Sequence, residues 1–381
     1  MATALVQLAL GVALVTPLAP RQFTARAPRP LLCAPPAALE PPPPPPAPSP
    51  PLSPRSQLLI LLPVYWAQVS WLSRAKLPHS VVGWLGAAGA RMRGDTLVGV
   101  GVLAAAGAAC YRRAWPAPRA PPWTAAASTR RLLLIETYVT LVVAFLLSPY
   151  VSDAVQHLLY LCVWLGAPLS KPSLHALQVL LSHLLWIAVA ARVLGTRLGR
   201  FFPPPFSRGA APDDNDEGGD ERWVALRWRA PWLWWALGGY FCSGLVYGAA
   251  EGVTALLPTP PTDNPVVQQL LHPEGGDRWA LAIGAVGPCV TAPVFEELLY
   301  RGFLLPALLR FAPLRFALPA QALLFGLHHQ TWRGLLPISA LGALWALLYV
   351  QTGNLVVPIA VHAMWNAKIF LHAVLGGRIG L

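Results

Sequence analysis

The sequence contains few charged residues. Of its 381 residues only 12% are charged, whereas 55% are hydrophobic and the mean hydropathy is +0.50. Soluble domains of this total length would need more surface charge, so we expect a polytopic membrane protein with the lipid bilayer as its partner. The net charge of +12 does not indicate nucleic-acid binding, because the basic residues fall between apolar runs and form no continuous basic domain. They favour contact with anionic lipid, or a role in orienting the chain in the bilayer.

Several common catalytic and metal-binding patterns are also missing. The chain has no Gly-x-Ser-x-Gly and no His-Glu-x-x-His sequence, which argues against a serine hydrolase and against a zincin protease. Its five cysteines have no short spacing between them, so neither a disulfide framework nor a thiolate metal site is indicated. The cysteines are Cys33, Cys110, Cys162, Cys242 and Cys289.

Residues 1–55 have the composition of a leader. They are rich in Ala, Pro and Arg and contain a single acid, Glu40, which is typical of an organelle transit peptide. A secretory signal is the alternative, because residues 5–18 are apolar, but no basic residue precedes that run. Residues 41–51 are almost all proline and predict a disordered polyproline II spacer. A transit peptide would direct the protein to a plastid (chloroplast) membrane.

Residues 201–222 mark the clearest boundary in the remainder of the chain. Three prolines at 203–205 are followed by six acidic residues among glycines, which predicts a solvated, disordered linker. The acids lack the fixed positions of a calcium-binding loop. The linker separates an N-terminal transmembrane region, residues 56–200, from a C-terminal domain, residues 223–381.

Apolar runs on both sides of the linker predict an all-α fold with about eight transmembrane helices. Residues 58–72 and 97–111 are shorter than the roughly 20 residues of a spanning helix, so they could be tilted or interfacial. Pro288 and Pro293 are expected to break or kink the path between two later runs. The remaining predicted helices are 132–147, 155–165, 174–194, 232–257, 266–271, 279–290, 295–311, 314–329, 335–351 and 355–374.

The stretch Phe295–Gly302 places two carboxylates and an arginine in an otherwise apolar segment. Charges within a bilayer are costly, so they usually face the protein interior and carry function. Glu297 and Arg301 are one helical turn apart in the favourable order for an ion pair. Glu296 is rotated by about 100° from Glu297, so it can point into a cavity while Arg301 neutralises its neighbour.

Three further polar features fall in apolar helices. Phe325-Gly326-Leu327-His328-His329 closes one predicted helix, and His362 and Asn366 share one face of the last helix. Glu251 lies in an earlier helix and looks isolated. His175 and His183 are eight residues apart on the run 174–194, which favours packed or interfacial roles over a metal site.

These residue types can hydrolyse a peptide bond with an activated water. A buried carboxylate can act as general base, and a nearby imidazole can orient the water and carry a proton. A second imidazole and an amide N–H can stabilise the oxyanion of a tetrahedral intermediate. Glu296, His329, His362 and Asn366 supply this set from three helices. A divalent metal such as zinc is an alternative, since Glu296, His329 and His362 would supply three ligands and leave the fourth position to water.

The motifs Glu-Glu-x-x-x-Arg, Phe-x-x-x-His and His-x-x-x-Asn, each on its own apolar helix, resemble those of the CPBP (Abi) intramembrane endopeptidases. This family includes the type II CAAX prenyl proteases and bacteriocin-processing relatives, and the resemblance spans about residues 264–374. It implies that Glu296 activates water, that Glu297 is its partner tied to Arg301, and that His362 and Asn366 stabilise the oxyanion. Members are called metalloproteases, but the resemblance does not decide whether a metal takes part. His328 is an extra histidine outside the pattern.

Two classes of function follow from these observations. The first is an intramembrane endopeptidase that acts on membrane-associated protein substrates. The second is a non-catalytic membrane scaffold or chaperone built on the same fold. A transporter is a more distant alternative, because buried acids and histidines also form proton relays.

Overall fold

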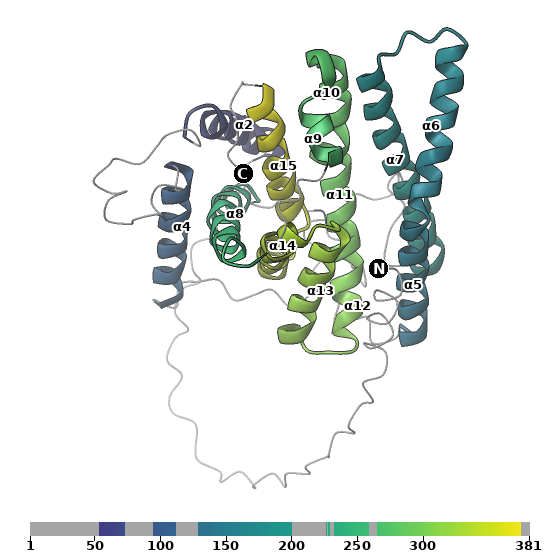
Figure 1. Cartoon of the computed structure of the whole chain (residues 1–381). Coiled ribbons are helices and arrows are strands. Elements are labelled where there is room, and N and C mark those ends of the chain that lie inside the picture. Colours follow the sequence, from purple (N-terminus) through teal and green to yellow (C-terminus); the bar gives the residue numbers. More distant parts are fainter. Residues whose placement is uncertain are drawn as a thin grey trace, which may run out of the picture. The chain divides into compact units, whose positions relative to one another are not determined.

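The computed structural model describes residues 53–72, 94–111, 129–199, 226, 228, 232–258 and 265–374. Every regular element in these ranges is a helix, as predicted, and they contain no strand (Figure 1). The predicted leader, residues 1–55, lies outside the described residues except for its last three, and so does the acidic linker, residues 201–222. In the N-terminal region the helices are α2 (Pro54–Ser70), α4 (Gly94–Tyr111), α5 (Arg131–Leu146), α6 (Ser148–Trp164) and α7 (Lys171–Leu198).

The second region begins with α8 (Leu233–Thr254) and the short α9 (Pro265–Leu271). A long continuous helix follows, made of α10 (Arg278–Val286), the π-helical η5 (Gly287–Thr291), α11 (Ala292–Glu297), the π-helical η6 (Leu298–Leu304) and α12 (Leu305–Leu309). The last three helices are α13 (Leu314–His328), α14 (Trp332–Thr352) and α15 (Val356–Val374). A single 3₁₀ turn, η4 (Glu274–Gly276), precedes α10.

The expected count of about eight spanning helices is not confirmed. Within the described residues three helices are long and apolar enough to cross a membrane: Lys171–Leu198, Arg278–Leu309 and Trp332–Thr352. The helices α5 and α6 meet at Leu147 with a bend of 42° and would add a fourth if the pair forms one span. The separate runs predicted at 132–147 and 155–165 therefore correspond to two helices, and Pro149 suits the first turn of the second.

Pro288 and Pro293, which were expected to break or kink the path, do not break the helix before the two glutamates. The helix runs without interruption from Arg278 to Leu309. The π-helical segment η5 contains Pro288 and ends two residues before Pro293, and its wider turns accommodate the missing N–H groups locally. A second π-helical segment, η6, follows the glutamates. Such π-bulges are frequent at functional sites, and here they flank the Glu-Glu pair on both sides.

Side-chain caps set where the helices begin. Ser170 accepts a hydrogen bond from the N–H of Ser173 at 3.1 Å and so starts α7. Asp277 starts α10 in the same way by accepting from the N–H groups of Trp279 (2.9 Å) and Ala280 (3.0 Å). At the C-terminal end of α14, Gly353 adopts a left-handed conformation with φ of 58°, which ends the helix.

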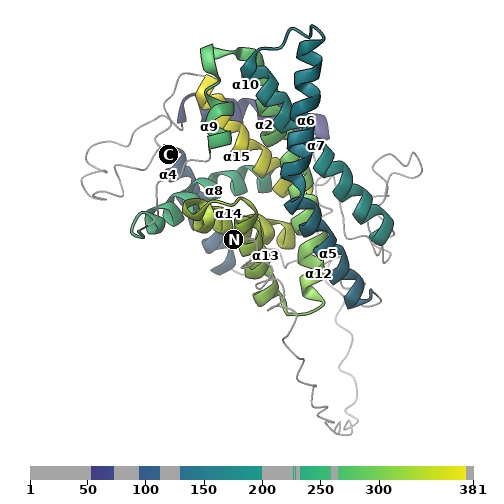
Figure 2. The same cartoon turned by 45° about the vertical axis from the view of Figure 1, so that its right-hand side comes forward.

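The main core lies where α14 packs between α8 and α13, with α15 alongside (Figures 1 and 2). The indole N–H of Trp345 donates to Ser243 Oγ on α8 at 3.0 Å, so α14 is tied to α8 by a buried hydrogen bond. Gly239 permits this close approach, because a Cβ there would collide with the side chain of Leu348. This packing brings the N-terminal half of α15 and the middle of α14 against the Glu-Glu segment of the long helix.

Candidate functional site

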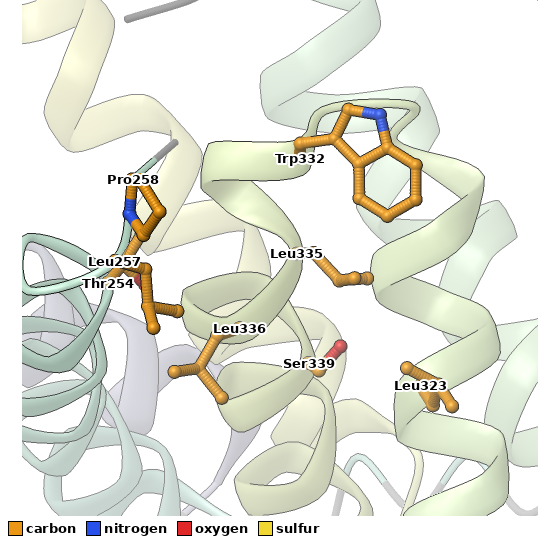
Figure 3. A pocket seen from close by; sticks show the side chains of 8 residues that line it. All are labelled: Thr254, Leu257, Pro258, Leu323, Trp332, Leu335, Leu336 and Ser339. Carbon is orange, nitrogen blue, oxygen red and sulfur yellow. The ribbon is translucent and has the colours of Figure 1, made fainter. Parts of the chain in front are cut away.

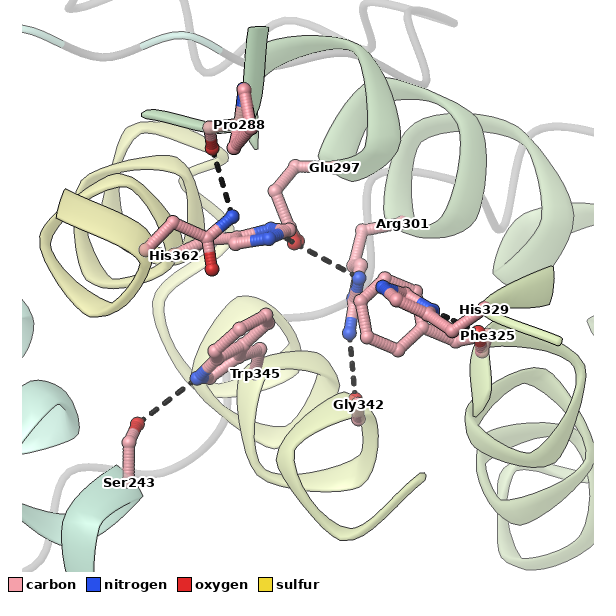
Figure 4. Close-up of polar contacts among 10 residues, drawn as sticks. Ser243, Pro288, Glu297, Arg301, Phe325, His329, Gly342, Trp345 and His362 are labelled. Atoms are coloured by element: carbon pink, nitrogen blue, oxygen red, sulfur yellow. Dashed lines mark hydrogen bonds and ion pairs between the residues drawn. The ribbon is translucent and has the colours of Figure 1, made fainter. Parts of the chain in front are cut away.

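Glu297 is the centre of the buried polar network. Its Oε1 accepts hydrogen bonds from Arg301 Nη1 and from His362 Nδ1, each at 3.0 Å (Figure 4). The side chains of Glu297 and Arg301 are completely buried, and that of His362 is 3% exposed. The predicted ion pair between Glu297 and Arg301 is therefore present, one helical turn apart. Its link to His362 adds α15 to the pair, which sequence spacing alone did not predict.

Arg301 makes further contacts that explain how a guanidinium can be buried here. Its Nη2 donates to the carbonyl oxygen of Gly342 on α14 at 2.8 Å. Its Cζ lies 4.8 Å from the ring centroid of Phe325, the first residue of the second motif, and 5.9 Å from that of Trp345. A buried charge is tolerated when it is paired and hydrogen-bonded. Both Nη atoms of Arg301 are bonded in this way, whereas its Nε has no hydrogen-bond partner. Arg301 thus connects the long helix to both α13 and α14.

Both predicted histidines are held through Nδ1. The Nδ1 of His329 lies 2.9 Å from the carbonyl oxygen of Phe325. A carbonyl can only accept, so this nitrogen carries the proton, and Nε2 of the neutral ring is an acceptor. The Nδ1 of His362 likewise donates to the carboxylate of Glu297, while the ring stacks on Trp345 with centroids 4.3 Å apart. Each ring therefore keeps Nε2 for other chemistry.

The Asn366 amide is bonded to the π-helical segment before the glutamates. Its Nδ2 donates to the carbonyl oxygen of Pro288 at 2.8 Å. That carbonyl is free because the N–H of Ala292 donates instead to Gly287 and because Pro293 has no N–H. Asn366 thus replaces a missing helical hydrogen bond and joins α15 to the long helix. One of its two amide hydrogens is used in this way.

Glu296 differs from its neighbour. Its side chain is half-buried, whereas that of Glu297 is completely buried. The Oε2 atoms of both glutamates are buried without a hydrogen-bond partner, but only Glu297 has its Oε1 held by Arg301 and His362. Within the described part of the chain it makes no hydrogen bond with His329 or His362, whereas Glu297 does bond His362. The expected division between the two carboxylates is therefore present in one respect: Glu297 is neutralised by Arg301, and Glu296 points elsewhere.

Comparison with known proteins gives a family match for the part of the chain that contains these residues. Residues 278–368 match the model of a family described as type II CAAX prenyl endopeptidase Rce1-like. This segment is an Rce1-like domain. It contains all six predicted site residues, so the resemblance based on the three motifs is confirmed over these residues. They are Glu296, Glu297, Arg301, His329, His362 and Asn366.

A curated relative gives a weaker match. The chain is 25% identical over 137 residues to the Bacillus subtilis (strain 168) protein described as "Putative membrane peptidase YdiL". The match covers 36% of this chain and 54% of the relative, so the chain spans about half the length of this relative. No solved structure matches the chain significantly.

The Rce1-like domain does not assemble the suggested metal site. Within the described residues no group of three or more His, Cys, Asp or Glu side chains is spaced to hold a metal ion. The suggested ligands Glu296, His329 and His362 therefore do not fit a three-ligand zinc centre in this arrangement.

Glu251 and His328, two other residues singled out in the sequence, make contacts outside the Glu297 network. Glu251 on α8 is not isolated, because its Oε1 pairs with Arg333 Nη2 of α14 at 3.0 Å. Sequence spacing could not reveal this contact between residues 82 positions apart. The extra histidine, His328, packs its ring edge-on against Phe145 of α5 with centroids 4.3 Å apart, so it serves packing between the two regions.

A largely apolar pocket of about 490 Å³ lies where the end of α8 meets α13 and α14 (Figure 3). Leu323 and Trp332 line it from α13 and from the start of α14, and both are well exposed. Ser339 contributes a buried hydroxyl without a hydrogen-bond partner. No residue of the Glu297 network lines this pocket.

Proposed function

We propose that this protein is an intramembrane endopeptidase that hydrolyses peptide bonds of membrane-associated protein substrates. The observation that carries the proposal is the buried network of Glu297, Arg301 and His362 beside the unpartnered oxygen of Glu296. Ionisable groups inside apolar helices are costly in free energy, so their presence there usually marks a functional site. The Rce1-like match supports the same class of activity.

In this proposal Glu296 is the general base. Its Oε2 has no protein partner and can accept a proton from the attacking water. The neutral ring of His329 offers Nε2 as an acceptor, which orients the same water through its second hydrogen. Hydroxide attack on the substrate carbonyl then forms a tetrahedral oxyanion, and the proton held by Glu296 is passed to the leaving amine.

His362 and Asn366 are proposed to stabilise that oxyanion. When His362 is doubly protonated, Nδ1 donates to Glu297 and Nε2 donates to the substrate oxygen. The second amide hydrogen of Asn366 provides a further donor, because the first is held by Pro288. Glu297 and Arg301 act as positioning residues, since they hold the ring of His362 and the three packed helices without touching substrate.

The test is cleavage of a membrane-embedded peptide by the purified full chain in detergent or nanodiscs. We expect cleavage by the wild-type protein and its loss in Glu296→Ala. The matched control is Glu251→Ala, which removes a carboxylate of the ion pair with Arg333 outside the proposed site and should cleave at the wild-type rate. Cleavage by folded Glu296→Ala would remove this mechanism.

A non-catalytic membrane scaffold or chaperone is the second candidate. It is favoured by the hydrogen bonds of His362 and Asn366, which both hold the fold together. A scaffold would need the helices but not the base. In cells lacking the wild-type protein, Glu296→Ala would then complement fully, whereas an endopeptidase requires that it does not.

We propose a plastid membrane as the location, with residues 1–55 as transit peptide and leader and residues 201–222 as a linker. The support is the acid-poor, arginine-bearing composition of the first 55 residues. N-terminal sequencing of the mature protein tests this, because import should remove the leader. A mature protein that begins at Met1 would exclude it.

A further inference from the structure

A second, more polar pocket lies between α6 and α7, outside the Rce1-like domain. Its volume is about 210 Å³, which suits a small polar group. It is lined by Gln156, Tyr160, Lys171, Leu174, His175 and Gln178. Five of these six side chains can donate a hydrogen bond, and none is acidic.

The lining residues converge because of their helical spacing. On α7 they follow positions i, i+3, i+4 and i+7 from Lys171, which form one stripe, and Gln156 and Tyr160 are one turn apart on α6. Gln178 is fixed in this stripe because its Nε2 donates to Ser152 Oγ on α6 at 3.1 Å. The pocket walls are therefore set by the packing of the two helices.

Two groups in this pocket have no partner in the protein. The Nε2 of His175 is buried and makes no hydrogen bond. Lys171 is exposed and forms neither a hydrogen bond nor an ion pair with any other described residue. The nearest capping acid, Asp277, is held on the opposite stripe of α7 by the hydroxyl groups of Ser170 and Ser173. The pocket thus has an unneutralised cation and a buried polar atom without a partner.

The pocket lies at one end of two candidate spans. The spans that begin at Lys171 and at Arg278 are joined at their first turns by the hydrogen bond between Ser170 and Asp277. Two tryptophans near the same level are strongly exposed, Trp164 (80%) and Trp279 (78%). Exposed tryptophans beside basic residues at the ends of apolar helices are typical of a membrane–water interface. Lipid headgroups occupy this level of a bilayer.

We propose that this pocket binds the phosphate group of an anionic membrane lipid. Lys171 supplies the charge, and the imidazole of His175 with the side chains of Gln156 and Tyr160 supplies hydrogen bonds to the phosphate oxygens. The acyl chains lie along α7, where the stripe that lines the pocket continues toward the middle of the helix. That continuation includes Leu181 (36% exposed) and Leu185 (46% exposed). The lipid then joins α6 to α7 and stabilises the N-terminal region against the long helix.

The test is native mass spectrometry of the delipidated full chain, titrated with phosphatidylglycerol or with phosphatidylcholine of the same acyl chains. We expect preferential binding of phosphatidylglycerol, and a loss of affinity of roughly fivefold in Lys171→Gln. His175→Gln should also weaken binding. The matched control is Arg197→Gln, which removes one positive charge from the last turn of the same helix and should bind as the wild type does.

Three results would overturn the proposal. The first is equal affinity for the two lipids. The second is equal loss in Lys171→Gln and Arg197→Gln, which would mean general surface charge rather than this pocket. The third is displacement of the bound lipid by inorganic phosphate at comparable concentration, which would make the ligand a soluble anion. Because Lys171 is exposed, its variant should keep the wild-type helix content by circular dichroism.

Discussion

The Nδ1 of His362 lies 3.0 Å from Oε1 of Glu297, the second glutamate of the pair. This bond fixes which nitrogen of the ring remains available and ties the last helix to the Glu-Glu segment. The same oxygen also accepts from Arg301. One carboxylate oxygen therefore links Glu297 both to the next turn of its own helix and to α15. The first glutamate takes no part in these bonds and keeps a buried oxygen without a partner.

Replacing Glu297 should destabilise the fold. In Glu297→Gln the guanidinium of Arg301 stays buried without a counter-charge, and such losses cost about 3–5 kcal/mol. Glu251→Gln breaks a partly exposed pair, for which a change of about 0–1 kcal/mol is expected. Thermal unfolding in detergent, followed by tryptophan fluorescence, compares the two. Equal melting temperatures would show that Glu297 does not hold the helices together.

Asn366→Ala should lower stability as well as any activity. The Pro288 carbonyl loses its donor, and an unsatisfied buried acceptor costs roughly 1–3 kcal/mol. Asn366→Asp should behave alike, because an ionised carboxylate cannot donate to a carbonyl. The measurement is the free energy of unfolding. An unchanged value in both variants would mean that the π-helical segment needs no cap from α15.

A methyl group at Gly342 should displace the side chain of Phe325, on which the guanidinium of Arg301 packs. A Cβ there would lie 2.9 Å from Cδ1 of Phe325, the ring beneath the guanidinium, and 3.4 Å from the backbone of Ala322. We expect Gly342→Ala to destabilise by about 1–3 kcal/mol. The control is Gly248→Ala on α8, where nothing lies within 4 Å of the added atom, so higher helix propensity should make it neutral or slightly stabilising. Matching melting temperatures for the two variants would contradict the tight packing of α13 on α14.

The fold should become less stable at acidic pH because the carboxylate of Asp277 becomes protonated. Hydrogen bonds from the hydroxyl of Ser170 and the N–H of Ala280 hold the pKa of the Asp277 carboxyl below its ordinary value of 3.8. Because the folded-state pKa is the lower one, the carboxylate stabilises the fold fully above about pH 4, and this contribution is lost as the pH falls through the folded-state pKa.

The corresponding measurement is the melting temperature of Asp277→Ala against wild type across this range. The variant should melt lower at neutral pH, and the gap should close toward about pH 2. Asp153→Ala is the control, since this exposed residue on α6 caps no helix start. A gap of constant size at every pH would mean that the charge of Asp277 contributes nothing.

The sequence predicted the helices and their polar motifs because both depend on local spacing. The Glu297–Arg301 pair depends only on a spacing of four residues within one helix. The left-handed conformation of Gly353 depends only on the local turn that ends α14. Contacts between distant residues were not predictable in this way. Glu251 was expected to be isolated, yet Arg333 lies within 3.0 Å, because helix packing and not spacing decides that contact.

The prolines show a second limit of predicting the fold from the sequence. When each missing N–H is considered alone, Pro288 and Pro293 predict a break or a kink in the helix. The helix instead continues, since π-helical turns shift the hydrogen bonds and Asn366 supplies a donor from α15. The expected count of about eight spanning helices is not confirmed, because apolar runs in the sequence are more numerous than helices of spanning length among the described residues.

The most direct test of the proposed water attack is one turnover of a membrane peptide by excess enzyme in ¹⁸O-labelled water. Attack by a water activated by Glu296 places one ¹⁸O in the new C-terminal carboxyl group of the product, and Glu296→Gln should slow its formation by about 10²–10⁴-fold. An unlabelled first product would mean that a protein carboxylate attacked the peptide instead. That result, or the same rate in folded Glu296→Gln, would contradict the account.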